Sequence, residues 1–308
     1  MFVYTKLDDS AVALLCCPIC KGALGAKEDH FVCSNCCTVF PLVHAPGGRI
    51  FDFRIHRPPF LVPQDETRWL RVQRIYEEFD VDFAKRDKLQ EYLDEIDSVR
   101  EIYTEEFHIA GSVLDVGGNQ GKLRHFLSDK EVPLYITVDP FVDVFRYAHL
   151  PNLLQAYPCL LRPCNFLASR AEHLPFISNS FDWVHMRSVV DHFADPYMAF
   201  KEAYRVLKPN GHLLIGLSIV ERNASSPKSM LQLVSRKIRS AGIVPVLKAV
   251  AGKLTRSFQS EHDDHNFRLK YQELLDLISM TGFSVIKEHW QKPPYTFVIY
   301  VSARTEKR

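Results

Sequence analysis

A short glycine-rich stretch, VLDVGGNQG at Val113–Gly121, sets the strongest limit on how this chain can fold. Its apolar start is typical of a buried strand, and KLRHFLSDK after it predicts a helix. A strand, a glycine turn and a helix begin the βαβ series of nucleotide-binding α/β proteins. Two common phosphate-binding turns are excluded by the spacing. Val116 stands where the dinucleotide fingerprint needs its first glycine, and no Gly-Lys-Ser/Thr follows.

An acid in this stretch indicates a ligand without phosphate. Asp115 would repel a pyrophosphate, but it suits a cationic nucleoside such as S-adenosylmethionine. The turn fits D-x-G-x-G-x-G when it is read from Asp115 to Gly121, with Asn119 in place of the middle glycine. Asparagine tolerates the left-handed backbone region better than most residues, so we expect Asn119 to adopt a left-handed conformation.

The next predicted strand, Leu134–Val138, strengthens this interpretation because it ends at Asp139. An acid at the tip of the second strand is placed to accept hydrogen bonds from both hydroxyls of a ribose. The α/β pattern then continues with a strand at Phe181–Met186, a helix at Ala194–Leu207, a turn at Lys208–Gly211 and a strand at His212–Leu217.

Six short motifs in this region point to one family. They are VLDVGGNQG, VDP, AEHLPF, NSFDWV, DHFADP and EAYRVLKPNGHLLI, spread over about residues 111–218. Together they resemble the class I S-adenosylmethionine-dependent methyltransferases of the small-molecule type. The resemblance implies an α/β fold, a doubly wound, seven-stranded Rossmann-like methyltransferase sheet, and a methyltransferase activity (EC 2.1.1.-) with S-adenosyl-L-methionine as cofactor.

The same resemblance implies a set of cofactor-binding residues. Arg170 departs from the family pattern, because an acid that bonds the adenine amino group is usual there, so adenine recognition rests on backbone groups or on Glu172. The implied set is Asp115, Gly117 and Gly121 at the methionine end, Gly118 and Asn119 in the same turn, Asp139 at the ribose, Ala171 and Glu172 near the adenine, and Arg187 past the fourth strand.

One histidine is a candidate catalytic base by analogy. His192, in VVDHFADP, follows the fourth strand and would serve a hydroxyl acceptor, although a packing or helix-capping role is the simpler explanation of a histidine there. The chain has no Asn/Asp-Pro-Pro-Tyr/Phe at the end of that strand, which disfavours methylation of a nucleobase amine.

The cysteines are concentrated near the N-terminus, where six of the eight fall between Cys16 and Cys37. Two pairs have two-residue spacing, Cys17 with Cys20 and Cys33 with Cys36, which is the spacing of a closed tetrahedral zinc site. Four thiolates leave no open position on the metal, so we expect a structural Zn²⁺. Cys16 and Cys37 flank the pairs and stay open as alternative ligands.

This segment resembles the zinc-ribbon module of the methyltransferase activators, which is also fused to many bacterial methyltransferases. CPICKGAL, FVCSNC and VFPLVHAPGGRIFDF carry the resemblance over about residues 13–55. A glycine usually follows the last ligand in that family, and here the residue is Cys37.

We therefore predict three regions: a zinc ribbon at 1–55, a helical connector or lid at 56–110, and an S-adenosylmethionine-binding domain at 111–308. A basic insertion at about 219–265 carries eight basic and four acidic residues, a net charge of +4. It is either a lid over the substrate or a surface for an anionic partner, such as lipid, a phosphorylated or lipid-linked substrate, or RNA.

The overall composition restricts the partners. A net charge of +1 argues against a general nucleic-acid-binding surface, although local contact with nucleic acid is not excluded. The sequence shows no transmembrane segment and no signal-peptide layout, so we expect a cytoplasmic protein. We expect a methyltransferase for a small-molecule, glycan-linked or lipid-linked acceptor. The alternatives are an RNA or protein methyltransferase that uses the ribbon to bind substrate, and a non-catalytic binding protein.

Overall fold

The computed structural model describes residues 3–56, 64–219, 266, 268–292, 297–305 and 307, with the side chains of 64 and 65 left out. The predicted basic insertion therefore lies outside the described residues, except for Ile219. Within the described part of the chain, no helix is both long enough and apolar enough to cross a bilayer.

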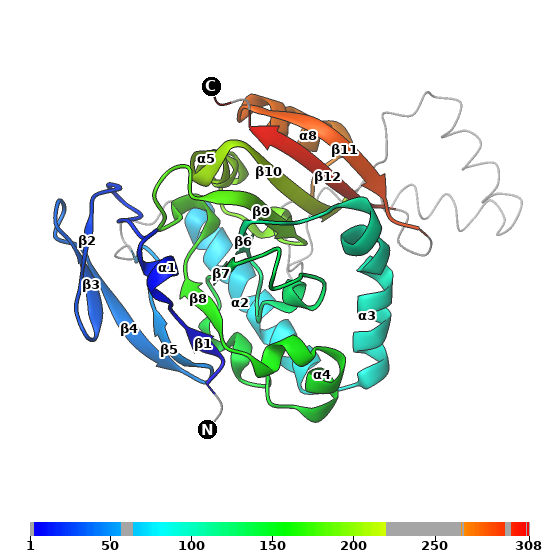
Figure 1. Cartoon of the computed structure of the whole chain (residues 1–308), viewed down its shortest axis with the longest axis horizontal. Coiled ribbons are helices and arrows are strands. Elements are labelled where there is room, and N and C mark those ends of the chain that lie inside the picture. Colours follow the sequence, from blue (N-terminus) through cyan, green and yellow to red (C-terminus); the bar gives the residue numbers. More distant parts are fainter. Residues whose placement is uncertain are drawn as a thin grey trace, which may run out of the picture.

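A large, mostly parallel sheet forms the centre of the molecule (Figure 1), in the strand order β1-β8-β7-β6-β9-β10-β12-β11. Only β12 is antiparallel to its neighbours β10 and β11. The middle strands β6, β7 and β8 are almost continuously buried, as expected for a sheet that is covered on both faces. The strands span Thr5–Lys6 (β1), Ser112–Val116 (β6), Leu134–Asp139 (β7), Cys164–Ala168 (β8), Phe181–Arg187 (β9), Leu207–Ser218 (β10), Phe283–Trp290 (β11) and Val298–Thr305 (β12).

The prediction of seven strands is wrong by one, because the N-terminal segment adds β1 to the edge of the sheet. Thr5 and Lys6 pair in parallel with Cys164 and Asn165 of β8. The main-chain amide of Cys164 also donates to the carbonyl of Tyr4, 2.9 Å away. Two residues are too few to produce a recognisable strand pattern in the sequence.

The helices include two long ones before the first central strand, namely α2 (Gln64–Ala84) and α3 (Leu89–Glu101), followed by a π-helical turn at Ile102–Glu106. They occupy the region that the sequence predicts as a helical connector or lid. The other α-helices among the described residues are α1 (Asp9–Val12), α4 (Pro151–Ala156), α5 (Pro196–Val206) and α8 (Tyr271–Met280). Short 3₁₀ helices lie at Lys122–His125, Val142–Phe145, Pro158–Leu161, Ala171–His173 and Val190–His192.

Helix α5 shows how local sequence fixes an element beside the site. The side chain of Asp195 caps its first turn by accepting from the main-chain amide of Met198 at 3.0 Å, and Pro196 occupies the first helical turn. Its buried residues Ala199, Phe200, Ala203 and Val206 lie at helical spacing and pack into the main core.

Two local predictions are wrong. The segment after the glycine turn is a short 3₁₀ helix, Lys122–His125, instead of a longer helix. Only residues 122–133 connect the turn to β7, and the carbonyl of Ser128 already accepts from the amides of Glu131 and Val132 in a second turn. The predicted turn at Lys208–Gly211 belongs to β10, where it interrupts the register with β9.

The cysteine-rich segment folds into a separate antiparallel sheet of β2 (Leu24–Ala26), β3 (His30–Cys33), β4 (Val39–Ala45) and β5 (Gly48–Phe51). We call this sheet, with the cysteine turns around it, the ribbon. Figure 1 shows it in blue at one end of the molecule, with α3 at the opposite end. Main-chain hydrogen bonds join the ribbon to the central domain, from Cys16 to Pro175 at 2.9 Å and from Phe53 to Ala168 at 2.8 Å.

Candidate functional site

The glycine turn begins where β6 ends, and its backbone requires the residues found there. Gly117 has φ of +68°, and a Cβ atom at this position would clash with Val189. A Cβ atom on Gly118 would clash with the carboxyl group of Asp115 and the hydroxyl of Thr137. Asn119 has φ of +48°, which confirms the predicted left-handed conformation. Residues without a side chain are therefore required at Gly117 and Gly118, because the backbone of the turn lies close to Asp115, Thr137 and Val189.

Asp139 lies at the end of β7, directly beside this turn, and is buried. Its Oδ1 accepts from the amide of Phe141 at 2.9 Å, and its Oδ2 accepts from the amide of Asn119 at 3.2 Å. Each carboxylate oxygen can accept a further hydrogen bond, so the residue keeps capacity for a diol such as ribose. Burial raises the pKa of Asp139 to about 7, and the nearby acids Asp80 and Glu77 add to the rise.

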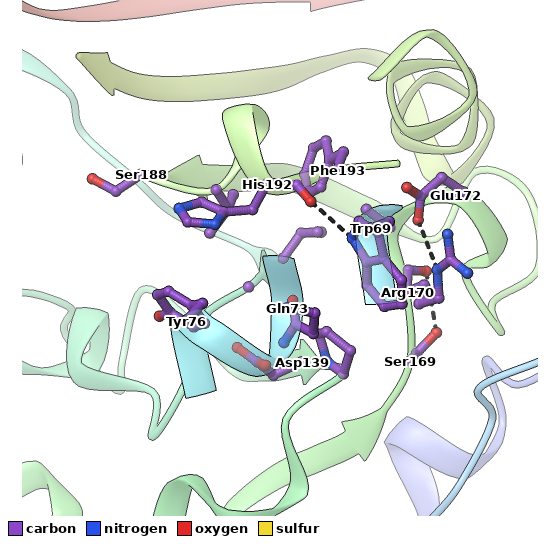
Figure 2. A pocket seen from close by; sticks show the side chains of 15 residues that line it. Trp69, Gln73, Tyr76, Asp139, Ser169, Arg170, Glu172, Ser188, His192 and Phe193 are labelled. Carbon is purple, nitrogen blue, oxygen red and sulfur yellow. Dashed lines mark hydrogen bonds and ion pairs between the residues drawn. The ribbon is translucent and has the colours of Figure 1, made fainter. Parts of the chain in front are cut away.

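A first cavity of about 510 Å³ opens in front of Asp139. Figure 2 shows its lining, with Trp69, Gln73 and Tyr76 contributed by α2. Several predicted cofactor residues meet here. They are Gly117, Asp139, Ala171 and Glu172, together with the candidate base His192.

Arg170 closes one side of the first cavity. Its guanidinium lies over the ring of Trp69, 4.0 Å from the ring centroid. It forms ion pairs with the carboxylates of Glu66 and Glu172, the latter at 3.4 Å from Nε. The cation that replaces the family's usual acid is thus held between two carboxylates and an aromatic face.

Glu172 is engaged with the protein itself. Its Oε1 accepts from the main-chain amides of Ala194 at 2.7 Å and Asp195 at 3.2 Å, while Oε2 faces Arg170. Because these contacts occupy the carboxylate, the geometry favours backbone groups over Glu172 as partners for an adenine.

His192 lines the first cavity, where its ring packs 4.8 Å from the ring of Tyr76. Its main-chain carbonyl accepts a hydrogen bond from Trp69 Nε1 at 2.8 Å. The structure therefore places this histidine beside residues predicted to bind the nucleoside, and its catalytic role stays a prediction.

A second cavity of about 980 Å³ continues from the first, and both are lined by Tyr76, Gly117, Ser188 and Val189. It brings together Asp115, Gly117, Gly118 and Asn119 of the predicted cofactor-binding turn and Arg187, which was predicted past the fourth strand. Gly121 lines neither cavity and instead ends the turn, with φ of +77°. Five aromatic side chains also line the second cavity: Tyr76, Phe83, Tyr103, Phe126 and Tyr157.

Three charged groups meet in the wall of the second cavity. Glu95 accepts from Arg187 at 3.2 Å and lies 3.5 Å from Lys122, and the hydroxyl of Tyr157 donates to it at 2.9 Å. Burial alone would raise the pKa of Glu95, but the two cations and these hydrogen bonds lower it to about 2. Glu95 is therefore a permanent anion that holds Arg187 in place.

Asp115 is more enclosed than its motif implies. The hydroxyl of Tyr135 donates to its Oδ2, and Nδ1 of His185 lies 2.7 Å from its Oδ1. Nε2 of His185 in turn lies 2.8 Å from the hydroxyl oxygen of Tyr103. Sequence reasoning missed these three partners. A signal did exist for His185, because it lies between the apolar residues Val184 and Met186 of a central strand, and its register partner in β6 is Asp115.

The four predicted zinc ligands form one group. Their sulfur atoms all lie within 4.8 Å of one another, at 3.6 Å for Cys17 with Cys36 and 3.4 Å for Cys20 with Cys33. A tetrahedral zinc site with bonds of about 2.3 Å needs sulfur separations of about 3.8 Å, so the donor set fits Zn²⁺.

The two flanking cysteines lie outside this group. Cys16 is buried, and its amide donates to the carbonyl of Pro175. Cys37 is exposed and has φ of +57°, the backbone conformation that the family's usual glycine would adopt there.

The geometry defines an α/β domain in which two adjoining cavities lie at the ends of the central strands β6, β7 and β9. Comparison with known proteins identifies its class: residues 114–215 match a methyltransferase domain family. Over these residues the chain is similar to methyltransferase domains.

Curated relatives agree with this class. A ubiquinone/menaquinone biosynthesis C-methyltransferase of Blochmanniella floridana is 24% identical over 190 residues, covering 60% of this chain and 70% of the relative. The enzyme of the same name from Haemophilus ducreyi is 45% identical over 122 residues, and the match spans 40% of this chain and less than half, 45%, of that relative. A solved methyltransferase from Aquifex aeolicus is 16% identical, with a TM-score of 0.43, covering 70% of this chain and 98% of that one.

Proposed function

We propose that this protein transfers the methyl group of S-adenosylmethionine to a small acceptor, free or linked to a glycan or a lipid, that enters the second cavity. The observation that carries the proposal is the junction of the two cavities at Gly117. One cavity contains the diol-binding acid Asp139, and the other contains Arg187 and the aromatic side chains.

The residues fit the cofactor in several ways. Asp139 accepts hydrogen bonds from the ribose hydroxyls, and the side-chain-free turn at Gly117 and Gly118 lets the ligand pass from one cavity to the other. When bound, S-adenosylmethionine supplies an activated methyl group on a sulfonium. The chain's contribution is to bind and orient the two reactants, which supplies much of the acceleration in such reactions.

Helix α2 acts as the cover of both cavities. Trp69 and Gln73 line the first cavity, Tyr76 lines both, and Asp80 and Phe83 line the second. These positions follow one face of the helix, at spacings of three and four residues. A helix along both cavities excludes water from the reacting groups.

Binding of S-adenosylmethionine, measured by titration calorimetry, tests the proposal. We expect a single site in the wild-type protein and an affinity lower by about 10- to 100-fold in Asp139→Ala, because two hydrogen bonds are lost. Asp143→Ala is the matched control, since Asp143 lies four residues further on and lines neither cavity. An absence of binding at millimolar cofactor would rule out the methyltransferase function.

Turnover is then measured with radiolabelled cofactor and a panel of acceptors. The two bacterial relatives act in ubiquinone and menaquinone biosynthesis, so hydroquinones belong in this panel beside glycolipids and RNA. If RNA is the only acceptor that is methylated, the proposed small acceptor is wrong and the acceptor is a macromolecule.

We also propose that Cys17, Cys20, Cys33 and Cys36 hold a structural Zn²⁺ in the ribbon. The sulfur separations given above support a closed tetrahedral site. The ion would stabilise a small sheet whose own apolar core is limited to a few phenylalanines, among them Phe31, Phe40 and Phe53.

A further inference from the structure

A chain of three buried side chains ends in the second cavity. Oδ1 of Asp115 lies 2.7 Å from Nδ1 of His185, and Nε2 of His185 lies 2.8 Å from the hydroxyl oxygen of Tyr103. The three residues come from β6, from β9 and from the π-helical turn after α3, and all three line the cavity.

The hydrogen-bond partners fix the direction of this chain. Asp115 already accepts from the hydroxyl of Tyr135 at Oδ2, and its Oδ1 faces the imidazole. A carboxylate only accepts, so Nδ1 of His185 carries the proton and donates it. Nε2 is then an acceptor, and the hydroxyl of Tyr103 must donate to it. The Tyr103 oxygen also interacts with the hydroxyl of Tyr300, and its second lone pair can accept from a group in the cavity.

Tyr103 is held in its neutral form. Burial raises the pKa of Tyr103 well above its usual value, and the neighbouring Tyr300 and Asp115 act in the same direction, partly offset by Arg187. A neutral hydroxyl between a ligand and an imidazole can receive one proton while it passes on another.

The position of Tyr103 in the backbone is also unusual. It lies in the π-helical turn at Ile102–Glu106, and π-helical turns occur frequently at functional sites. Its ring packs 5.1 Å from Phe126 in the cavity wall. The aromatic lining around it favours a flat ring as the ligand.

We propose that Tyr103, His185 and Asp115 form a proton relay that deprotonates a flat ring bearing a weakly acidic hydroxyl group. This inference rests on the proposed methyltransferase function and names the class of its acceptor. The hydroxyl proton of the ring passes to the Tyr103 oxygen as the Tyr103 proton passes to Nε2 of His185.

The remaining charges and bonds balance. The imidazolium is stabilised by the carboxylate of Asp115, and the ring is left as an anion. A new bond joins the ring oxygen to the methyl carbon as the carbon–sulfur bond breaks, and S-adenosylhomocysteine leaves. The imidazolium then releases its proton to water. Tyr103 contacts the substrate, and His185 and Asp115 act through it.

Nitrogen NMR of ¹⁵N-histidine-labelled protein tests the relay without turnover. The signals of His185 are identified by their loss in His185→Gln. We expect a proton on Nδ1 and an accepting Nε2, with the Nε2 resonance displaced in Tyr103→Phe and unchanged in Tyr92→Phe. Tyr92 is a buried tyrosine of α3 that does not line the cavity, so it is a matched control. A proton on Nε2 would overturn the proposal.

Kinetics with two probe acceptors, catechol and 1,4-dihydroxynaphthalene, test the proton transfer. We expect kcat to fall by about 100-fold in Tyr103→Phe and in His185→Gln, the usual scale for a general base. Affinity for S-adenosylmethionine should stay within about threefold of wild type, which shows that the variants are folded. His212→Gln is the control, because His212 stacks on Trp183 outside both cavities.

The outcomes separate this inference from the function on which it rests. A protein that binds the cofactor but methylates neither ring, or a Tyr103→Phe variant with kcat within threefold of wild type, overturns the relay alone. A protein that does not bind the cofactor overturns the proposed function, whatever the state of His185.

Discussion

Nζ of Lys21 lies 2.8 Å from Oε2 of Glu202, an ion pair between the ribbon and helix α5. Lys21 stands directly after the ligand Cys20 and also donates to the carbonyl of Leu174 at 3.4 Å. The same oxygen of Glu202 accepts from the amide of Leu174 at 3.0 Å. The turn that carries two of the four cysteines is thereby connected to the segment after Ala171, which forms the wall of the first cavity.

Replacing Lys21 tests how much the contact between the ribbon and helix α5 contributes to the stability of the protein. Lys21→Met leaves the buried carboxylate of Glu202 with one cation fewer, so we expect the free energy of unfolding to fall by about 1–2 kcal/mol. Urea unfolding measures it. Lys27→Met, at an exposed position of the ribbon, should change stability by less than about 0.5 kcal/mol. Equal effects of the two variants would show that the contact contributes nothing.

Removal of the metal should unfold the ribbon. We expect a strong chelator to extract one Zn²⁺ per chain and to lower Tm, because the free energy of zinc binding becomes part of the folding energy. The measurement is metal analysis combined with thermal unfolding. Cys33→Ser should lose the zinc, whereas Cys37→Ser should keep it, since Cys37 lies outside the ligand group. Zinc retained in Cys33→Ser would contradict the assigned ligand set.

The titration of Asp139 should make cofactor binding depend on pH. Its pKa is about 7 in the folded protein, so the carboxyl group becomes protonated below pH 7 and loses acceptor capacity. We expect the affinity for S-adenosylmethionine to be constant above about pH 8 and to fall steadily below pH 7. Calorimetry across this range measures the change, and a flat profile in the wild-type protein would refute it.

The same group should affect the stability of the free protein. An acid whose pKa rises from 3.8 to about 7 on folding takes up protons in the folded state, so stability falls as pH rises between these values. Asp139→Asn removes this penalty. We expect the variant to be more stable than wild type at pH 8, by up to about 4 kcal/mol, and to show little gain at pH 4. Urea unfolding at both values provides the comparison.

Asn119 offers a test of the turn. Its φ of +48° suits glycine, so Asn119→Gly should change stability by less than about 1 kcal/mol, whereas Asn119→Val should cost about 2 kcal/mol or more. Thermal unfolding measures both changes. If valine is tolerated as well as glycine, the conformation assigned to the turn is incorrect.

Local chemistry made part of the site predictable. The turn at Gly117 and Asn119 can adopt few backbone conformations. An acid at the end of a parallel strand, such as Asp139, must lie at the same edge of the sheet as this turn. The cysteine spacing was equally local. These features depend on residues close in sequence, so their patterns can be recognised before the fold is known.

Contacts between distant residues were not predictable in the same way. Tyr103 meets His185 across 82 positions, and only the packing of the turn after α3 against β9 brings them together. The enclosure of Asp115 by Tyr135 and His185 likewise depends on the register of three strands. For α2, the sequence predicted a helical connector but not that its face from Trp69 to Phe83 lines both cavities.

The edge strand β1 has a consequence for the order in which the chain folds during synthesis. Thr5 pairs with Cys164, so the N-terminal strand cannot join the sheet until about 160 further residues have left the ribosome. The ribbon strands β2 to β5 pair only with near neighbours in sequence and are able to form early. In a nascent chain the ribbon can thus be folded while β1 is still unpaired. The N-terminal segment can pair with the central sheet only after β8 has emerged.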